Sequence, residues 1–182
     1  IPNGQMIDLG DYRVHVYSEG ENEKAPTLIF LSGSATVAPV YDFKALYSRI
    51  SDEYQIAVVE KAGYGYSDIV EVDRDVASMV MEVRSALNGA GIEAPYVLLP
   101  HSMSGLEAIY WVQNYPDEIS GIIGIDMAVP DAYDKEYNLI ISKTMMTLGR
   151  ASVKLGLLRI PGIYPLNEAP LTEKEAKQQR LL

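Results

Sequence analysis

Four short apolar segments recur along the chain and constrain its fold more than any other feature of the sequence. They are TLIFL (27–31), QIAVVE (55–60), YVLL (96–99) and GIIGID (121–126). Each has the length of a strand but lacks the strict alternation of a strand with one face in water. Continuous apolar runs of this length are typical of strands that are covered on both faces, as in a parallel sheet.

The segments between these strands have the spacing of amphipathic helices. In 73–88, apolar residues follow the i, i+3, i+4, i+7 spacing of one helix face: Val76, Met79, Val80, Val83 and Leu87. Asn88 and Gly89 predict the end of this helix. A second helix is predicted over 105–115; it carries Leu106, Ile109, Tyr110 and Val112 and ends before Pro116.

An additional strand precedes these segments. YRVHVYS (12–18) alternates and is rich in β-forming residues. Because it is close in the chain to the strand at 27–31, we expect these two strands to pair antiparallel at one edge of the sheet. Strands that alternate with helices indicate right-handed β-α-β crossovers, so the expected fold class is α/β, with a mostly parallel sheet flanked by helices.

The sequence changes character after Pro130. Residues 131–160 are rich in Leu, Ile and Met without a strand-like run, which predicts two helices interrupted near Gly149. The segment TEKE, which begins at Thr172, matches a capping box and predicts the start of another helix. We therefore predict a core over 1–130 and a helical cap over 131–182.

Composition excludes several classes of protein. The 182 residues are 48% apolar, which is enough for one compact core. The net charge of −10 is not offset by any Lys and Arg cluster, so nucleic acid is excluded as a partner. The absence of cysteine excludes disulfides and thiolate metal sites. The chain begins at Ile1 rather than Met, and a signal or membrane anchor could precede it, so no compartment is predicted.

The segment YVLLPHSMSGLEAIYW (96–111) carries the candidate nucleophile, Ser102. A sharp strand-to-helix turn lifts a serine hydroxyl above the edge of a sheet and directs a helix N-terminus at developing negative charge. Small residues two before and two after the serine relieve crowding in such a turn; Ser104 is small, whereas Pro100 is an awkward substitute for glycine. The alternatives are Ser104 itself, which lies too deep in the helix, or an ordinary βα loop whose serines cap the helix.

Two other segments bear on this site. Ser32-Gly33-Ser34 directly follows a buried strand, and the backbone N–H of Ser34 could act as an oxyanion donor beside that of Met103. VVEKAGYGYSD (58–68) contains glycines that partly match a nucleotide-binding loop. The pattern G-x-G-x-x-G fails there at Asp68, and the loop follows the wrong strand for it.

The order FLSGS, AGYGYSD, LLPHSMSGLEAIYWVQNYPDEI, GIIGIDMAVP resembles the α/β-hydrolase superfamily, in its serine-nucleophile branch with a helical cap after the sixth strand. The resemblance spans about residues 12–130. It implies that Ser102 is the nucleophile and that the Met103 and Ser34 amides are the oxyanion donors. It also argues against epoxide hydrolases and haloalkane dehalogenases, which use an aspartate at the elbow.

The sequence departs from the usual pattern of this superfamily at three positions: Ser32 replaces a usual His, and Pro100 and Ser104 replace usual glycines. These departures concern the oxyanion loop and the elbow. They bear on rate and substrate more than on fold.

The sequence lacks a suitable histidine. The triad of this fold runs Ser, then Asp or Glu, then His, but no histidine follows Ser102. His15 precedes the serine and is predicted to be a strand side chain with a satisfied partner. His101 is adjacent to Ser102 and is predicted to point away from it as a packing residue.

Two explanations remain open for the missing histidine. In the first, the core is incomplete and a separate or missing C-terminal segment supplies the His and the acid; a sheet that ended here would leave a long buried edge unpaired. In the second, the chain is a non-catalytic relative. Asp126 is a possible acid, although an aspartate at this position is more often structural. Glu60 is predicted to order the loop 61–68, and Glu107 to be a rim residue near the site.

The sequence thus predicts a serine hydrolase that cleaves an ester or amide of a small, partly apolar substrate through an acyl-enzyme. Met145 and Met146 could adapt to varied substrates, or could simply pack the cap on the core. No cofactor and no metal is predicted. The rivals are a non-catalytic binding protein on the same scaffold and, more weakly, a nucleotide-binding doubly wound domain.

Overall fold

The structure is a computed structural model that describes residues 3–21, 24–34, 36–133 and 171–182, with isolated residues between the last two ranges. One compact unit comprises Ile1–Ala128 and Ala169–Leu182, and a second comprises Val129–Glu168. The predicted division into a core and a cap stays a prediction. Most of 131–160, including Met145 and Met146, lies outside the described residues.

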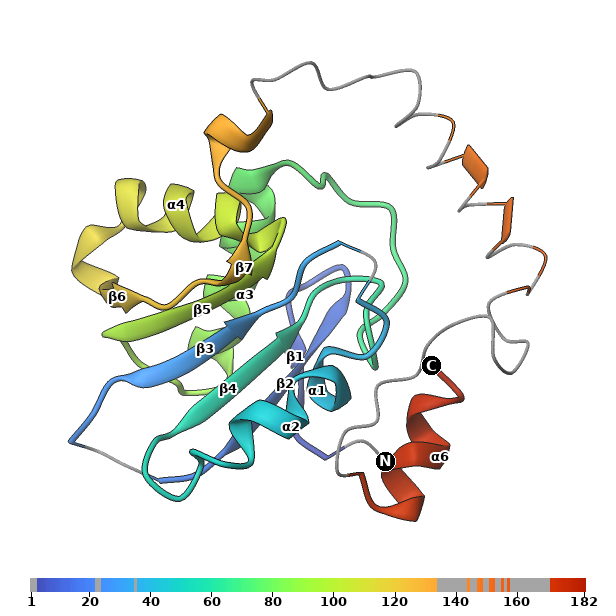
Figure 1. Cartoon of the computed structure of the whole chain (residues 1–182), viewed down its shortest axis with the longest axis horizontal. Coiled ribbons are helices and arrows are strands. Elements are labelled where there is room, and N and C mark those ends of the chain that lie inside the picture. Colours follow the sequence, from blue (N-terminus) through green and yellow to red (C-terminus); the bar gives the residue numbers. More distant parts are fainter. Residues whose placement is uncertain are drawn as a thin grey trace. The chain divides into compact units, whose positions relative to one another are not determined.

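The first unit contains a sheet of seven strands in the order β1-β2-β4-β3-β5-β6, with β7 also beside β5 (Figure 1). Pairing is parallel from β4 through β3 and β5 to β6 and β7, and antiparallel for β1 with β2 and for β2 with β4. The expected α/β fold with a mostly parallel sheet is confirmed. The strands are β1 (Gln5–Asp8), β2 (Arg13–Glu19), β3 (Thr27–Leu31), β4 (Ile56–Glu60), β5 (Tyr96–Ser102), β6 (Ile119–Ile122) and β7 (Ile125–Met127).

Strand pairing differs from the prediction at one edge. The strands predicted over 12–18 and 27–31 do not pair, because β2 lies beside β4, with Val16 opposite Val59. All five residues of β3 are buried, and it has a parallel partner on each side, which closeness in the chain could not reveal. The edge position belongs to β1, a strand of four residues that the sequence analysis did not predict.

Helices cover both faces of the sheet (Figure 1). The predicted helices at 73–88 and 105–115 are confirmed as α3 and α4, whereas the short α1 and α2 were not predicted. Their bounds are α1 (Pro39–Asp42), α2 (Lys44–Tyr47), α3 (Val76–Gly89), α4 (Ser104–Asn114) and α6 (Glu173–Gln179), with 3₁₀ turns η1 (Pro116–Glu118) and η2 (Pro130–Tyr133). Among the described helices none is long and apolar enough to cross a membrane.

The core consists of two apolar clusters, one on each face of the sheet. In β3, Ile29 and Leu31 join the cluster under α3 and α4, whereas Leu28 and Phe30 join the cluster under α1 and α2. Because successive side chains of a strand point to opposite faces, both faces of β3 need apolar residues. The continuous apolar run predicted this two-sided burial, and the structure confirms it.

The buried face of α4 is not formed by its large aliphatic residues. Leu106, Ile109, Tyr110 and Val112 are only half-buried, whereas the buried face is formed by Ser104, Gly105, Glu107, Ala108 and Trp111. Gly105 allows the helix to approach the backbone that follows β7, since a Cβ there would collide with the Ala128 carbonyl oxygen. The close approach at Gly105 therefore requires this face to turn inward, although it carries the polar residues Ser104 and Glu107.

The last helix, α6, begins at the predicted capping box. The Thr172 hydroxyl accepts from the amide of Glu175, and the Glu175 carboxylate accepts from the amide of Thr172, which confirms the motif. The helix is bound to α1 and α2: Tyr41 donates to Gln178, and Lys44 forms an ion pair with Glu175. Residues 169–182 consequently group with the sheet-bearing unit.

Glu60 connects three segments at the end of β4. Its carboxylate accepts from the Tyr66 amide (2.9 Å) and the Val40 amide (3.3 Å), and it lies 3.0 Å from Nδ1 of His15. The predicted role of Glu60 in ordering the loop 61–68 is confirmed. His15 is fully buried and also bonds to the Asn3 carbonyl oxygen (2.7 Å), so it is the satisfied strand residue that the sequence predicted.

We expect Gly65→Ala to destabilise the protein far more than Gly63→Ala. Both glycines have a positive φ, +51° and +81°, so each substitution costs about 1–2 kcal/mol of backbone strain. A Cβ at Gly65 would also collide with the Glu60 carboxylate, whereas the space at Gly63 is open. Urea unfolding should show at least about 2 kcal/mol between the variants. Equal losses would mean that Glu60 does not organise this loop.

We expect Glu118→Gln to lower stability at neutral pH but not in acid. The hydrogen bond from Arg84 holds the pKa of Glu118 below its usual range. A depressed carboxyl pKa contributes stability above the unfolded-state pKa, and this contribution is lost as pH falls through the folded-state pKa. Because the pair is partly exposed, the difference in unfolding free energy should be about 1 kcal/mol or less at pH 7. It should shrink at pH 3; an unchanged difference there would contradict this.

Candidate active site

Ser102 lies at the bend between β5 and α4. It is the last residue of β5, and Met103 is the N-cap residue of α4. Its φ is +52°, a left-handed conformation that costs a non-glycine residue about 1–3 kcal/mol and that clusters at functional sites. In the described part of the chain, only Ser102 and Asp126 combine a side chain with a positive φ. The sharp bend that the sequence predicted at this serine is therefore present.

The segment 32–34 meets Ser102 directly. A Cβ on Gly33 would lie 2.7 Å from Cβ and 3.3 Å from Oγ of Ser102, so only glycine fits there. Ser34, on the exposed side of the same segment, follows it at once. The two segments predicted to carry the oxyanion donors, those of Ser34 and Met103, thus meet at the serine.

Ser104, the competing candidate, is fully buried. Its Oγ donates toward the carbonyl oxygens of Leu31 (2.7 Å) and His101 (2.8 Å) and accepts from the His101 amide (2.9 Å). A hydroxyl engaged in this way connects the end of β3 to the elbow and is not presented to a substrate. The sequence predicted a small residue at Ser104 that lies too deep in the helix to react, and it carried no signal of this role as a connector.

Neither histidine faces Ser102. The His101 ring packs edge-on against Phe43, a residue of the apolar cluster under α1 and α2, with ring centroids 6.1 Å apart. β4 and β3 lie between β2, which carries His15, and β5. At about 4.8 Å per strand spacing this amounts to roughly 14 Å. The 182 residues contain no other histidine, so no imidazole of this sequence can act on Ser102.

Asp126 lies on β7, which pairs with the end of β5. Ile125 is opposite His101 and Met127 is opposite Ser102, with an irregularity in register between them. Asp126 is exposed, with a φ of +48°. The Ala128 amide donates to the Ser102 carbonyl oxygen at 2.8 Å, so β7 helps to hold the elbow. The structure brings Asp126 to the same edge of the sheet as Ser102.

A buried ion pair lies behind the site, formed by Lys61 and Glu107. The two charged atoms are 2.6 Å apart, and both residues are 3% exposed. Burial raises the pKa of Glu107, and the Lys61 ammonium opposes this shift. The prediction that Glu107 is a rim residue is wrong, because the inward face of α4 carries it against the sheet. The sequence offered no signal for its pairing with Lys61.

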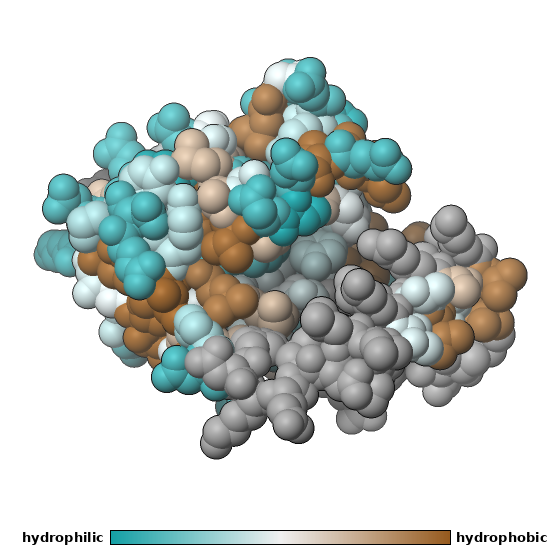
Figure 2. Space-filling model, turned by 90° about the horizontal axis from the view of Figure 1, so that it is seen from above, coloured by the Kyte–Doolittle hydropathy of each residue, from teal (hydrophilic) through white to brown (hydrophobic). Residues whose placement is uncertain are grey.

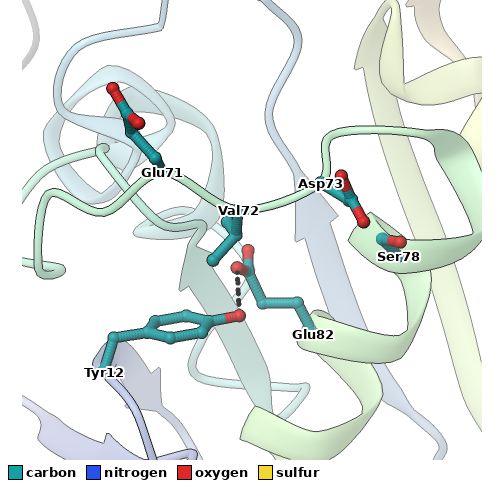
Figure 3. A pocket seen from close by; sticks show the side chains of 6 residues that line it. All are labelled: Tyr12, Glu71, Val72, Asp73, Ser78 and Glu82. Carbon is teal, nitrogen blue, oxygen red and sulfur yellow. Dashed lines mark hydrogen bonds between the residues drawn. The ribbon is translucent and has the colours of Figure 1, made fainter.

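An acidic hollow of about 600 Å³ lies elsewhere, at Tyr12 and the N-terminal half of α3 (Figure 3). Its buried carboxylate, that of Glu82, accepts from the Tyr12 hydroxyl (2.9 Å) and the Ala62 amide (3.1 Å) and pairs with Arg74. Burial and the bond to Glu82 raise the pKa of Tyr12 to about 12. The Glu82 carboxylate is thus already bound by Tyr12, Ala62 and Arg74. Ser102 does not line this hollow.

The surface of the protein carries apolar patches among polar ones (Figure 2). One exposed apolar side chain, Ile123, directly follows β6 and is 56% exposed. In the described part of the chain β6 pairs only with β5, and its residues Ile119 and Ile122 are half-buried. As far as the described residues show, this edge of the sheet presents unpaired backbone beside apolar side chains, which proteins normally cover.

Several curated proteins are similar to the chain, although no protein-family model matches it. It is 45% identical over 130 residues to YbdG of Bacillus subtilis, and the aligned region covers 71% of this chain and 39% of YbdG. It is 25% identical over 171 residues to YqjL of the same organism, and the aligned region covers 84% of this chain and 66% of YqjL. A 2-(acetamidomethylene)succinate hydrolase of Mesorhizobium japonicum is 22% identical over 122 residues, covering 67% and 42%. The chain thus spans between 39% and 66% of these relatives.

Solved structures of hydrolases share the fold. The haloalkane dehalogenase DatA from Agrobacterium tumefaciens C58 matches with a TM-score of 0.71 over 98% of this chain and 62% of its own, at 13% identity. A CIB-like hydrolase from Thermoplasma acidophilum matches with a TM-score of 0.58 over 70% and 64%, at 24% identity. At these identities the likeness concerns the fold, and it covers only part of each structure.

Proposed function

Because this chain belongs to the α/β-hydrolase superfamily, we propose that it is the nucleophile-bearing part of a serine hydrolase, with Ser102 as the nucleophile. The observation that carries the proposal is the positive φ of Ser102 at the junction of β5 and α4. A strained bend in this place exposes a hydroxyl above the carboxyl edge of a parallel sheet, where ligands of open α/β folds bind.

The proposed reaction is acyl transfer to water. Ser102 Oγ attacks the acyl carbon while a histidine takes its proton, and the carbonyl electron pair moves onto oxygen. The tetrahedral intermediate collapses, and the leaving alcohol or amine departs with the proton from the histidine. Water then attacks the acyl-serine in the same manner, which releases a carboxylic acid and restores the hydroxyl of Ser102.

The oxyanion is proposed to bind the amides of Met103 and Ser34. The Met103 amide belongs to the N-terminus of α4, where the helix dipole favours negative charge. The Ser34 amide belongs to the segment that Gly33 brings into contact with Ser102. Donors fixed in advance at a developing charge commonly contribute a factor of about 10²–10³ each to the rate.

The histidine, and with it the acid, is proposed to come from a polypeptide segment outside these 182 residues. Two observations support this: His15 and His101 are both directed elsewhere, and among the described residues no strand other than β5 pairs with β6. A further parallel strand against β6 would cover this edge. Asp126 stays a candidate for the acid, since it reaches the same edge of the sheet as Ser102.

The proposed substrate is a small, partly apolar ester or amide. The relatives support a hydrolase in general terms, including the succinate derivative hydrolase named above. The likeness to a haloalkane dehalogenase concerns the fold and not the proposed reaction. Those enzymes use an aspartate at the elbow, whereas this chain has a serine there.

A non-catalytic binding protein on the same scaffold is the alternative. It is favoured by one observation, the absence of a usable histidine in the sequence. The two proposals differ in whether the Ser102 hydroxyl reacts.

We expect a fluorophosphonate probe to react with Ser102 in protein isolated from its natural source together with any polypeptide bound to it. The hydroxyl displaces fluoride, and peptide mass spectrometry locates the adduct. Ser102→Ala should abolish labelling, whereas Ser85→Ala, at an exposed site on α3, should leave it unchanged. The enzyme proposal fails if no such preparation is labelled, or if the adduct is on Ser104.

We expect native preparations to contain a histidine-bearing segment in addition to residues 1–182, either in the same polypeptide or bound to it. Intact mass and peptide mapping under non-denaturing purification would identify it. Replacing its reactive histidine with alanine should slow labelling of Ser102 by about 10³-fold or more. Full labelling by these 182 residues alone would contradict the proposal.

A further inference from the structure

The buried pair of Lys61 and Glu107 has no part in the chemistry above, yet it contacts the segment that carries an oxyanion donor. Lys61 Nζ donates to Glu107 Oε1 (2.6 Å) and also to the backbone carbonyl oxygen of Ser32 (2.9 Å). We propose that Lys61 is a positioning residue that holds the segment 32–34 against Ser102. This inference rests on the proposed function.

Backbone hydrogen bonds on either side of Ser32 show why the bond from Lys61 is important for the segment 32–34. The preceding carbonyl, that of Leu31, is held by the Ser104 hydroxyl at 2.7 Å. Further along, the Gly65 amide donates to the Val37 carbonyl oxygen at 2.8 Å. Between Leu31 and Val37, Lys61 therefore holds the Ser32 carbonyl oxygen. The next residue, Gly33, makes the tight contact with Ser102.

Gly33 lies in close contact with Ser102, with no room for a larger residue. A single added carbon on Gly33 would lie 2.7 Å from Cβ of Ser102 and 2.9 Å from the His101 carbonyl oxygen. A rotation of the Ser32–Gly33 peptide would move the following amide relative to Ser102 Oγ. Oxyanion donors act over about 2.7–3.1 Å, and a misplacement of about 1 Å can cost on the order of 10²-fold in rate.

Glu107 keeps the ammonium in place. A buried lysine without a counter-charge would be strongly disfavoured, and Glu107 provides the charge from the first turns of α4. The Ser32 hydroxyl and Oε2 of Glu107 are both buried without a hydrogen-bond partner, so the contact of Lys61 is with the Ser32 backbone alone. The anchor therefore does not depend on which side chain stands at position 32, where the sequence departs from the usual histidine.

The double variant Lys61→Met/Glu107→Leu tests this role. It removes the bond to the Ser32 carbonyl without leaving a buried unpaired charge, and such replacements usually preserve folding. At saturating fluorophosphonate probe, the labelling rate constant of Ser102 should fall at least tenfold, while the probe concentration for half-maximal rate stays within about threefold. Lys61→Arg, which can still donate to both partners, should retain at least a third of the rate.

A matched control separates positioning from general loosening. Arg84→Met breaks the ion pair of Arg84 with Glu118 and should leave the labelling rate unchanged. Glu118 directly precedes Ile119, which pairs with Tyr96 at the start of β5, whereas Ser102 is the last residue of that strand. If the double variant does not fold, Lys61→Met/Glu107→Gln makes the same test with a polar, neutral partner.

The outcomes are distinct. If the unmodified protein is labelled and a folded double variant is labelled at the same rate, the role of Lys61 is overturned and the proposed function stands. If the unmodified protein is not labelled at all, the proposed function fails, and the inference fails with it.

Discussion

The site depends on a backbone bend that a serine adopts only under constraint. Ser102 is held in the left-handed region between β5 and α4, and neighbouring contacts must offset the strain. Ser104 bonds to the backbone on the preceding side of the bend and to the end of β3, and Ala128 donates to the Ser102 carbonyl oxygen. Three strands thus meet at this residue, and their contacts hold the bend in place.

Parallel strands explain why distant segments converge here. The carboxyl ends of β3, β4 and β5 lie at one edge of the sheet, so the residues that follow them become neighbours. Glu60 and Lys61 stand at the end of β4 and bind different partners: Glu60 bonds to the backbone at Tyr66 and Val40, whereas Lys61 reaches the Ser32 carbonyl oxygen. Two consecutive residues thereby position the segments that follow β3 and β4.

The predictions succeeded where one residue type or one periodicity was sufficient. Runs such as TLIFL (27–31) predicted strands buried on both faces, and Thr172 with Glu175 predicted a helix start, because these signals are local. The predicted strand pairing at the edge was wrong, and the inward face of α4 was not predicted. Both depend on partners far away in the sequence: β4 beside β2, and Ala128 against Gly105.

The sequence by itself determined the alternation of strands and helices, the place of the bend at Ser102 and the lack of a usable histidine after it. Hydrophobic period, turn chemistry and residue counts are written in the order of the residues, so they require no coordinates. Only the tertiary structure decided that Ser104 is buried as a connector, that Glu107 turns inward to Lys61 and that this pair holds the Ser32 carbonyl oxygen. Contacts of this kind join strands and helices that are separated by dozens of residues, and packing of the whole sheet sets their geometry.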